Sequence, residues 1–185
     1  FGVPALQISK RKAKVKELVE SNDLERPMIN LLKALQGNLQ EPLRTELLQL
    51  QQQFETIEIV INTLPSQMKY DQFLFQVPTG AKLRLIFNNP DMMPHNLVIV
   101  TPGSLEKVGK AADQLVSAQS TDNYVPDMPE VLIATPIVDS GQTYELVFRV
   151  PETPGNYPFV CTYPGHWPIM NGIMEVVSGV AEATL

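Results

Sequence analysis

The sequence contains a single cysteine, Cys161, and only two histidines. One cysteine excludes a disulfide within the chain, so cysteine usage gives no indication of the redox compartment. No apolar run approaches the ~20 residues that a membrane-spanning helix needs, which excludes such a helix in this chain. The formal net charge is -6, so the overall charge gives no support to nucleic-acid binding.

What the sequence does contain is typical of a globular protein. Hydrophobic residues make up 44% of the 185 residues and charged residues 18%, which is enough to build a core. This length suits one β-sandwich with an appendage better than two large domains. The chain begins at Phe1 without an initiator methionine or a leader-like segment, so we expect a processed product or part of a longer protein.

The pattern of apolar residues changes near residue 54. Before it, apolar residues recur at helical spacing, as in Leu43, Leu47 and Leu50. We therefore predict a short α-helical region over residues 1–54, which is a candidate for the tail of a larger protein. Residues 55–185 form the second predicted domain.

From residue 55 onward, short stretches alternate between apolar and polar residues and are separated by turn signals. Strands are expected over residues 55–61, 70–75, 82–87, 96–100, 131–134, 143–150, 157–161 and 172–177. The stretch over 70–75 contains a shift in spacing, which we attribute to a β-bulge. Residues 104–118 are instead predicted to form a helix capped by Ser104. About eight short strands with one inserted helix indicate a mainly β domain, either a sandwich or a barrel.

Candidate metal ligands gather in this second domain. Cys161 is followed by His166 five residues later and by Met170 four residues after that, and the remaining histidine is His95. A thiolate, two imidazoles and a distant thioether form the ligand set of a blue-copper electron-transfer site. The turn at Pro164-Gly165 allows His166 to return to the metal that Cys161 binds. We therefore predict one mononuclear copper ion held by His95, Cys161, His166 and, weakly, Met170.

The expected strands place these ligands at one end of the sandwich. Cys161 ends a strand, Met170 opens the last strand, and His95 begins a distant one, so the site is expected to cross-link the two sheets. The far edge of His166 is expected to reach solvent and to be the exit for electrons. An apolar rim is expected around it, formed by Met92, Met93, Pro164, Trp167, Pro168 and Ile169. Such a rim suits brief docking of a redox protein partner.

The string CTYPGHWPIM at residues 161–170 resembles the copper loop of azurin and its auracyanin-like relatives. His95-Asn96 resembles the His-Asn pair of the same family, and the resemblance extends over about residues 55–178. It implies a Greek-key cupredoxin β-sandwich with a type 1 copper centre, which carries single electrons and is not an enzyme. It also implies a periplasmic or other extracytoplasmic location, with a cytochrome or dehydrogenase as the partner that docks near His166.

The same resemblance implies supporting roles for three further residues. Asn96 and Thr162 would tie the two ligand loops together by hydrogen bonds. Pro94 stands where azurins usually have glycine; it keeps a carbonyl that is a candidate axial contact, but its ring fixes φ. The disulfide of azurins is impossible with one cysteine, and the helical region over 1–54 has no azurin counterpart.

Several alternatives follow from the same residues. A purple dinuclear copper centre needs two cysteines in the loop, so the single Cys161 excludes it. Zinc in the same ligands, or a hydrolase with Cys161 as nucleophile and His95 or His166 as base, stays open. So does a metal-binding or metal-free interaction module of a larger redox protein, without independent carrier activity. Metal analysis with a visible spectrum separates these alternatives.

Overall fold

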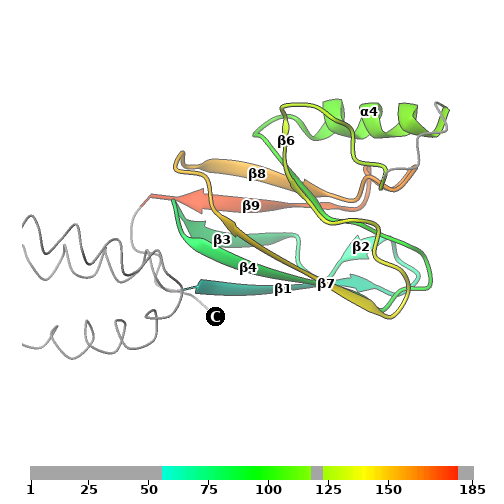
Figure 1. The fold of residues 1–185 in the computed structure, drawn as a ribbon, viewed down its shortest axis with the longest axis horizontal. Helices are drawn as coiled ribbons and strands as arrows, with labels where there is room; N and C mark the ends of the chain where they lie inside the picture. Colours follow the sequence, from blue (N-terminus) through cyan, green and yellow to red (C-terminus); the bar gives the residue numbers. More distant parts are fainter. Residues whose placement is uncertain (1–55, 118–122, 179–185) are drawn as a thin grey trace, which may run out of the picture. The chain divides into compact units, whose positions relative to one another are not determined.

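The computed structural model describes residues 56–117 and 123–178. These residues form a β-sandwich of two sheets with nine strands and one helix (Figure 1). The predicted mainly β sandwich with one inserted helix is confirmed, with nine strands in place of about eight. The helices predicted in residues 1–54 lie outside the described residues, so they and the domain boundary near residue 54 stay predictions.

The strands divide into a four-stranded and a five-stranded sheet. The four-stranded sheet has the order β2 (Lys69–Tyr70), β1 (Thr56–Leu64), β4 (Lys82–Asn89) and β7 (Gln142–Arg149). The five-stranded sheet has the order β3 (Leu74–Pro78), β9 (Asn171–Val177), β8 (Gly155–Val160), β5 (Val98–Val100) and β6 (Val131–Ala134). Paired strands are antiparallel except for β1 with β4 and β3 with β9.

Alternating burial along the strands builds the core between the two sheets. In β4, Leu83, Leu85 and Phe87 are fully buried and the residues between them are partly exposed. Successive side chains of a strand point to opposite faces, so this strand turns one apolar face inward. Phe159 of β8 and Met174 of β9 belong to the same apolar cluster. The core therefore lies between the sheets and continues to the end of the sandwich where β8 ends and β9 begins.

The single strand predicted over residues 70–75 is wrong. The structure has two strands there in different sheets: Tyr70 of β2 pairs with Thr63 of β1, whereas Leu74 of β3 pairs with Ile173 of β9. The shift in spacing that suggested a β-bulge marks the point where the chain crosses from one sheet to the other. Phe73, in the crossing segment, is largely exposed.

The inserted helix α4 spans Leu105–Ser117, which confirms the helix predicted over residues 104–118. Ser104 stands at its start, where its carbonyl accepts a hydrogen bond from the N–H of Val108 at 2.9 Å. The Ser104 hydroxyl lies 2.7 Å from the hydroxyl of Thr101. Val108 packs with Val98 and Val160, so the helix lies against β5 and β8 of the five-stranded sheet.

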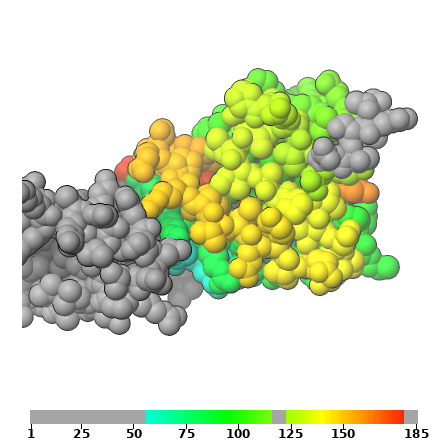
Figure 2. Space-filling model, viewed as in Figure 1, coloured from blue at the N-terminus to red at the C-terminus, as the bar shows by residue number. Residues whose placement is uncertain are grey.

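Two loops meet at one end of the sandwich. The first leads from β4 to β5 and the second from β8 to β9, and both leave the sheets at the same end because β5 and β8 are antiparallel neighbours. Figure 2 shows one face of the molecule, much of which is formed by β7 and the segment leading to it, in yellow. Within the part of the chain that the structure describes, no helix is long and apolar enough to cross a membrane.

Candidate metal centre

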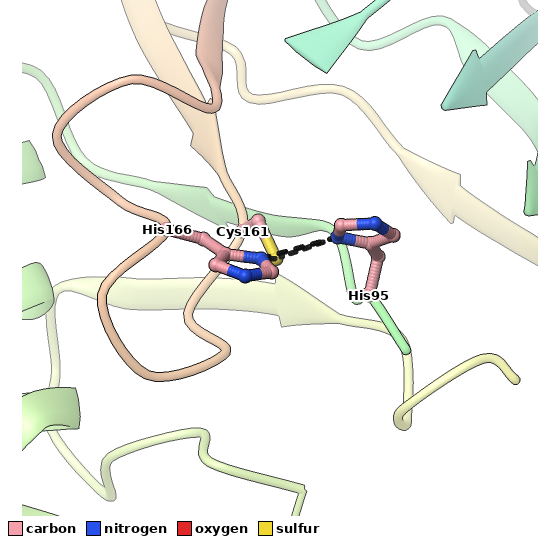
Figure 3. Close-up of side chains that lie close together, drawn as sticks. All are labelled: His95, Cys161 and His166. Carbon is pink, nitrogen blue, oxygen red and sulfur yellow. Dashed lines mark hydrogen bonds between the residues drawn. The ribbon is translucent and has the colours of Figure 1, made fainter. Parts of the chain in front are cut away.

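Three side chains with metal-binding atoms meet where these two loops come together. Nδ1 of His95 lies 3.7 Å from Sγ of Cys161, and Nδ1 of His166 lies 3.6 Å from the same sulfur. The two Nδ1 atoms are 3.2 Å apart. Figure 3 shows both imidazole rings and the thiol pointing toward one another. These three residues form the group of potential metal ligands found among the described residues.

The ligand-bearing loops adjoin three strands of the five-stranded sheet, β5, β8 and β9, so the ligands do not come from strands of both sheets as the cross-linking prediction expected. Cys161 follows β8, Met170 precedes β9, and His95 lies just before β5. Val98 of β5 pairs with Val160 of β8, so the start of one strand lies beside the end of the other. Antiparallel pairing within the five-stranded sheet thus brings the distant histidine to the loop.

His95 is also held by a second contact outside the strands. Its main-chain N–H lies 3.2 Å from the carbonyl oxygen of Val138, and its carbonyl accepts from the N–H of Val138 at 2.7 Å. The ring is fully buried. The position of this histidine is therefore fixed by the main chain on one side and by packing on the other.

The loop from Cys161 to Met170 is closed by its own main-chain hydrogen bonds. The N–H of Cys161 donates to the carbonyl of Met170 at 3.0 Å, and the N–H of Met170 donates to that of His166 at 2.8 Å. Gly165 has a φ of 79°, a left-handed conformation that favours glycine, and this lets the chain turn back before His166. Met170 is fully buried close to the other three residues. The loop therefore holds its residues in one compact arrangement.

Asn96 and Thr162 lie between the two ligand loops, and their side chains meet. Oδ1 of Asn96 accepts from the N–H of Thr162 at 2.8 Å, and Nδ2 of Asn96 donates to the Thr162 hydroxyl at 2.7 Å. Both side chains are buried. Pro94 directly precedes His95 and is half-buried; an axial contact from its carbonyl stays a prediction.

Burial sets the protonation of the thiol and of one imidazole. It raises the pKa of the Cys161 thiol to about 11, although nearby N–H groups of Asn96 and Tyr163 act in the opposite direction. Burial, and then the proximity of His95, lowers the pKa of His166. A neutral imidazole is ready to bind a metal, whereas the thiol must first release its proton to the solvent. A buried thiol with a raised pKa also argues against Cys161 as the nucleophile of a hydrolase.

The donor set fits a copper ion on its own geometry. Metal bonds of about 2.0–2.3 Å to nitrogen and sulfur, arranged in a trigonal plane, place the donor atoms about 3.5–3.8 Å apart. The three separations of 3.2–3.7 Å are close to this range. Two imidazoles and one thiolate in a trigonal arrangement, with a thioether beyond them, are the blue-copper set.

The surroundings of the site differ from the prediction in one respect. His166 exposes only 2% of its surface, less than expected for a ligand whose far edge reaches solvent. The ring of Tyr163 packs against it, with centroids 4.9 Å apart. One residue was missed altogether: the carboxylate of Asp91 lies 2.9 Å from Nε2 of His95. Nothing in the sequence except its spacing of four residues linked this aspartate to the histidine.

A sequence model of the copper binding proteins of the plastocyanin/azurin family matches residues 57–177. The chain belongs to this family. It is 30% identical over 122 residues to auracyanin-A of Chloroflexus aurantiacus, which covers 65% of this chain and 74% of that protein. It is 30% identical over 88 residues to azurin of Pseudomonas aeruginosa, covering 46% of this chain and 58% of that protein.

Among solved structures, the reduced auracyanin of Roseiflexus castenholzii superposes with a TM-score of 0.58 at 32% identity. The match covers 65% of this chain and 96% of the auracyanin chain. This cupredoxin is therefore an electron carrier with one type 1 copper centre. The resemblance to azurin and auracyanin is thus confirmed.

Proposed function

We propose that His95, Cys161 and His166 would hold the copper ion through Nδ1, Sγ and Nδ1, and that Met170 would be a weak fourth ligand. This assignment rests on one observation: the two Nδ1 atoms and the sulfur lie within 3.7 Å of one another, and all three side chains are buried. When bound, copper supplies one-electron chemistry by cycling between copper(I) and copper(II).

The surrounding residues keep this site nearly rigid between the two oxidation states. The Asn96–Thr162 pair ties the two loops together, and main-chain hydrogen bonds close the loop that carries Cys161 and His166. Buried and fully hydrogen-bonded groups move little, so the ligands need little rearrangement when an electron enters or leaves. A small rearrangement keeps the barrier to electron transfer low.

An apolar surface near the ligand loops supports docking of a redox protein. Met92 exposes 86% of its surface, Ile169 51% and Met93 40%, and Pro168 is also exposed. Such a small apolar surface suits a weak, short-lived complex. We propose that the partner is a cytochrome or a dehydrogenase that docks here, near His166. A periplasmic or other extracytoplasmic location is part of the same proposal and rests on the resemblance to azurins.

The ligand assignment is tested by Cys161→Ser in the full chain. Copper(II) loading of the unchanged protein should give an intense visible band from thiolate-to-copper charge transfer, and the serine variant should lose it entirely. Thr135→Ser, another conservative change at a buried position of the same sheet end, is the control and should keep the band. An intense visible band that survives in the Cys161→Ser protein would refute the assignment.

A further inference from the structure

A buried carboxylate lies behind one of the proposed copper ligands. Asp91, in the loop between β4 and β5, exposes only 2% of its surface. Its Oδ2 lies 2.9 Å from Nε2 of His95. Nδ1, on the other side of the same imidazole ring, faces Cys161 and His166. The ring therefore connects the carboxylate to the place where the metal-binding atoms meet.

The carboxylate of Asp91 is fixed by contacts that do not involve the histidine. Its Oδ1 accepts hydrogen bonds from the main-chain N–H groups of Ser66 at 3.0 Å and Met92 at 2.7 Å. Its own N–H donates to the hydroxyl of Thr63 at 3.2 Å. Two main-chain N–H donors on one carboxylate oxygen stabilise the ionised form of the side chain. The sandwich thus presents a fixed negative charge to one imidazole.

We propose that Asp91 is a positioning residue of the electron-transfer site, which holds His95 in the Nε2–H form and favours copper(II) over copper(I). The inference rests on the proposed ligand set, in which Nδ1 of His95 binds the metal. A histidine bound through Nδ1 carries its proton on Nε2, and that N–H donates to the Asp91 carboxylate. The partial negative charge passed to the ring stabilises the more positive of the two copper ions.

The second imidazole has different surroundings. Within residues 56–117 and 123–178, no carboxylate forms a hydrogen bond or ion pair with His166, whose ring packs against Tyr163 instead. The two histidines are therefore unequal: one is backed by a buried anion and the other by an aromatic ring. A change at Asp91 should accordingly reach the metal through His95.

The test is Asp91→Asn in the full, copper-loaded chain. Asparagine keeps the shape of the aspartate side chain and removes its negative charge. Its amide N–H₂ group would also face N–H donors to which the carboxylate had offered an acceptor. We expect the visible band to remain and the affinity for copper(II) relative to copper(I) to fall about tenfold, which raises the reduction potential by about 59 mV. In the copper(I) protein, the Nε2 proton of His95 should also exchange faster with solvent, as followed by NMR.

The matched control removes one negative charge far from the site. Glu152 is exposed in the turn between β7 and β8, beside Gly80, at the opposite end of the sandwich. Glu152→Gln should leave both the reduction potential and the exchange of the His95 proton unchanged. A shift in this variant equal to that of Asp91→Asn would mean that net charge alone acts, which would overturn the proposal.

The remaining outcomes separate this proposal from the copper assignment. An Asp91→Asn protein with the visible band and an unchanged potential would overturn the role of Asp91 and leave the copper site intact. No intense visible band in the unchanged protein would overturn the proposed function, and this inference with it. If Asp91→Asn cannot hold copper, Asp91→Glu decides: recovered binding supports a charged acceptor, and continued loss shows a purely structural role and overturns the proposal.

Discussion

At the residue scale, Met170 differs from the other proposed ligands because a thioether binds copper only weakly. Met170→Leu should therefore keep a blue site, since one thiolate and two imidazoles still hold the metal. Leucine is close in volume, so we expect a stability loss below about 1.5 kcal/mol. Leucine donates no electron pair to the metal, and it makes that side of the site less polar. Both effects favour copper(I). We expect the reduction potential to rise, on the order of 59 mV if the relative affinity changes tenfold.

A second methionine provides the control for this prediction. Met174 is also fully buried, but it lies within β9 and packs in the apolar core between the sheets. Met174→Leu should change stability by a similar amount and leave the potential as it was. Voltammetry on the two variants tests this prediction. If Met170→Leu leaves the reduction potential unchanged or lowers it, Met170 only fills the core and is not a ligand of the copper.

At the element scale, helix α4 is packed directly against the ligand loop. A Cβ built on Gly109 would lie 2.3 Å from the ring of Trp167, so the helix can approach this ring only because the position has no side chain. Nε1 of Trp167 also donates to the carboxylate of Asp113 one turn further along the helix, at 2.7 Å. The N–H of Gly165 contacts the other oxygen of that carboxylate at 3.4 Å. The helix thereby supports the turn that precedes His166.

Gly109→Ala should destabilise the protein in spite of the higher helix propensity of alanine. The propensity gain is about 1 kcal/mol, whereas forcing an extra methyl against a packed ring costs about 1–3 kcal/mol. Because the ring is stiff and hydrogen-bonded to Asp113, we expect a net loss of about 1 kcal/mol, measured by denaturant unfolding. Gln114→Ala, at an exposed position of the same helix, should cost nothing. A Gly109→Ala protein at least as stable as the unchanged one would contradict this packing argument.

At the scale of the whole molecule, residues 56–177 supply both sheets, the core and every proposed ligand. A chain that begins at Thr56 should therefore bind copper and show the same visible spectrum and reduction potential as the full chain. Residues 1–54 should matter for the choice of partner or for assembly. Copper titration and voltammetry on the two chains test this prediction. A shortened chain that folds but cannot hold copper would refute the independence of the two regions.

The sequence by itself determined which residues could bind the metal. The chain has one cysteine and two histidines, and the string from Cys161 to Met170 places the cysteine, one histidine and a methionine on one short loop. Side-chain chemistry and local spacing are properties of the sequence, so copper could be predicted without coordinates. The alternation in β4 and the Ser104 cap of α4 were equally local signals, and both elements form where they were expected.

The tertiary structure alone decided how distant segments meet. It brought His95 beside Cys161 through the pairing of β5 with β8, put Tyr70 and Leu74 in different sheets, and buried nearly all of His166. Periodicity tells which face of a strand is apolar, but it does not tell which strand lies beside it, because that depends on how all faces pack at once. The same holds for Asp91. A carboxylate four residues from a histidine can hydrogen-bond to its ring only when the fold buries both side chains and orients them toward each other.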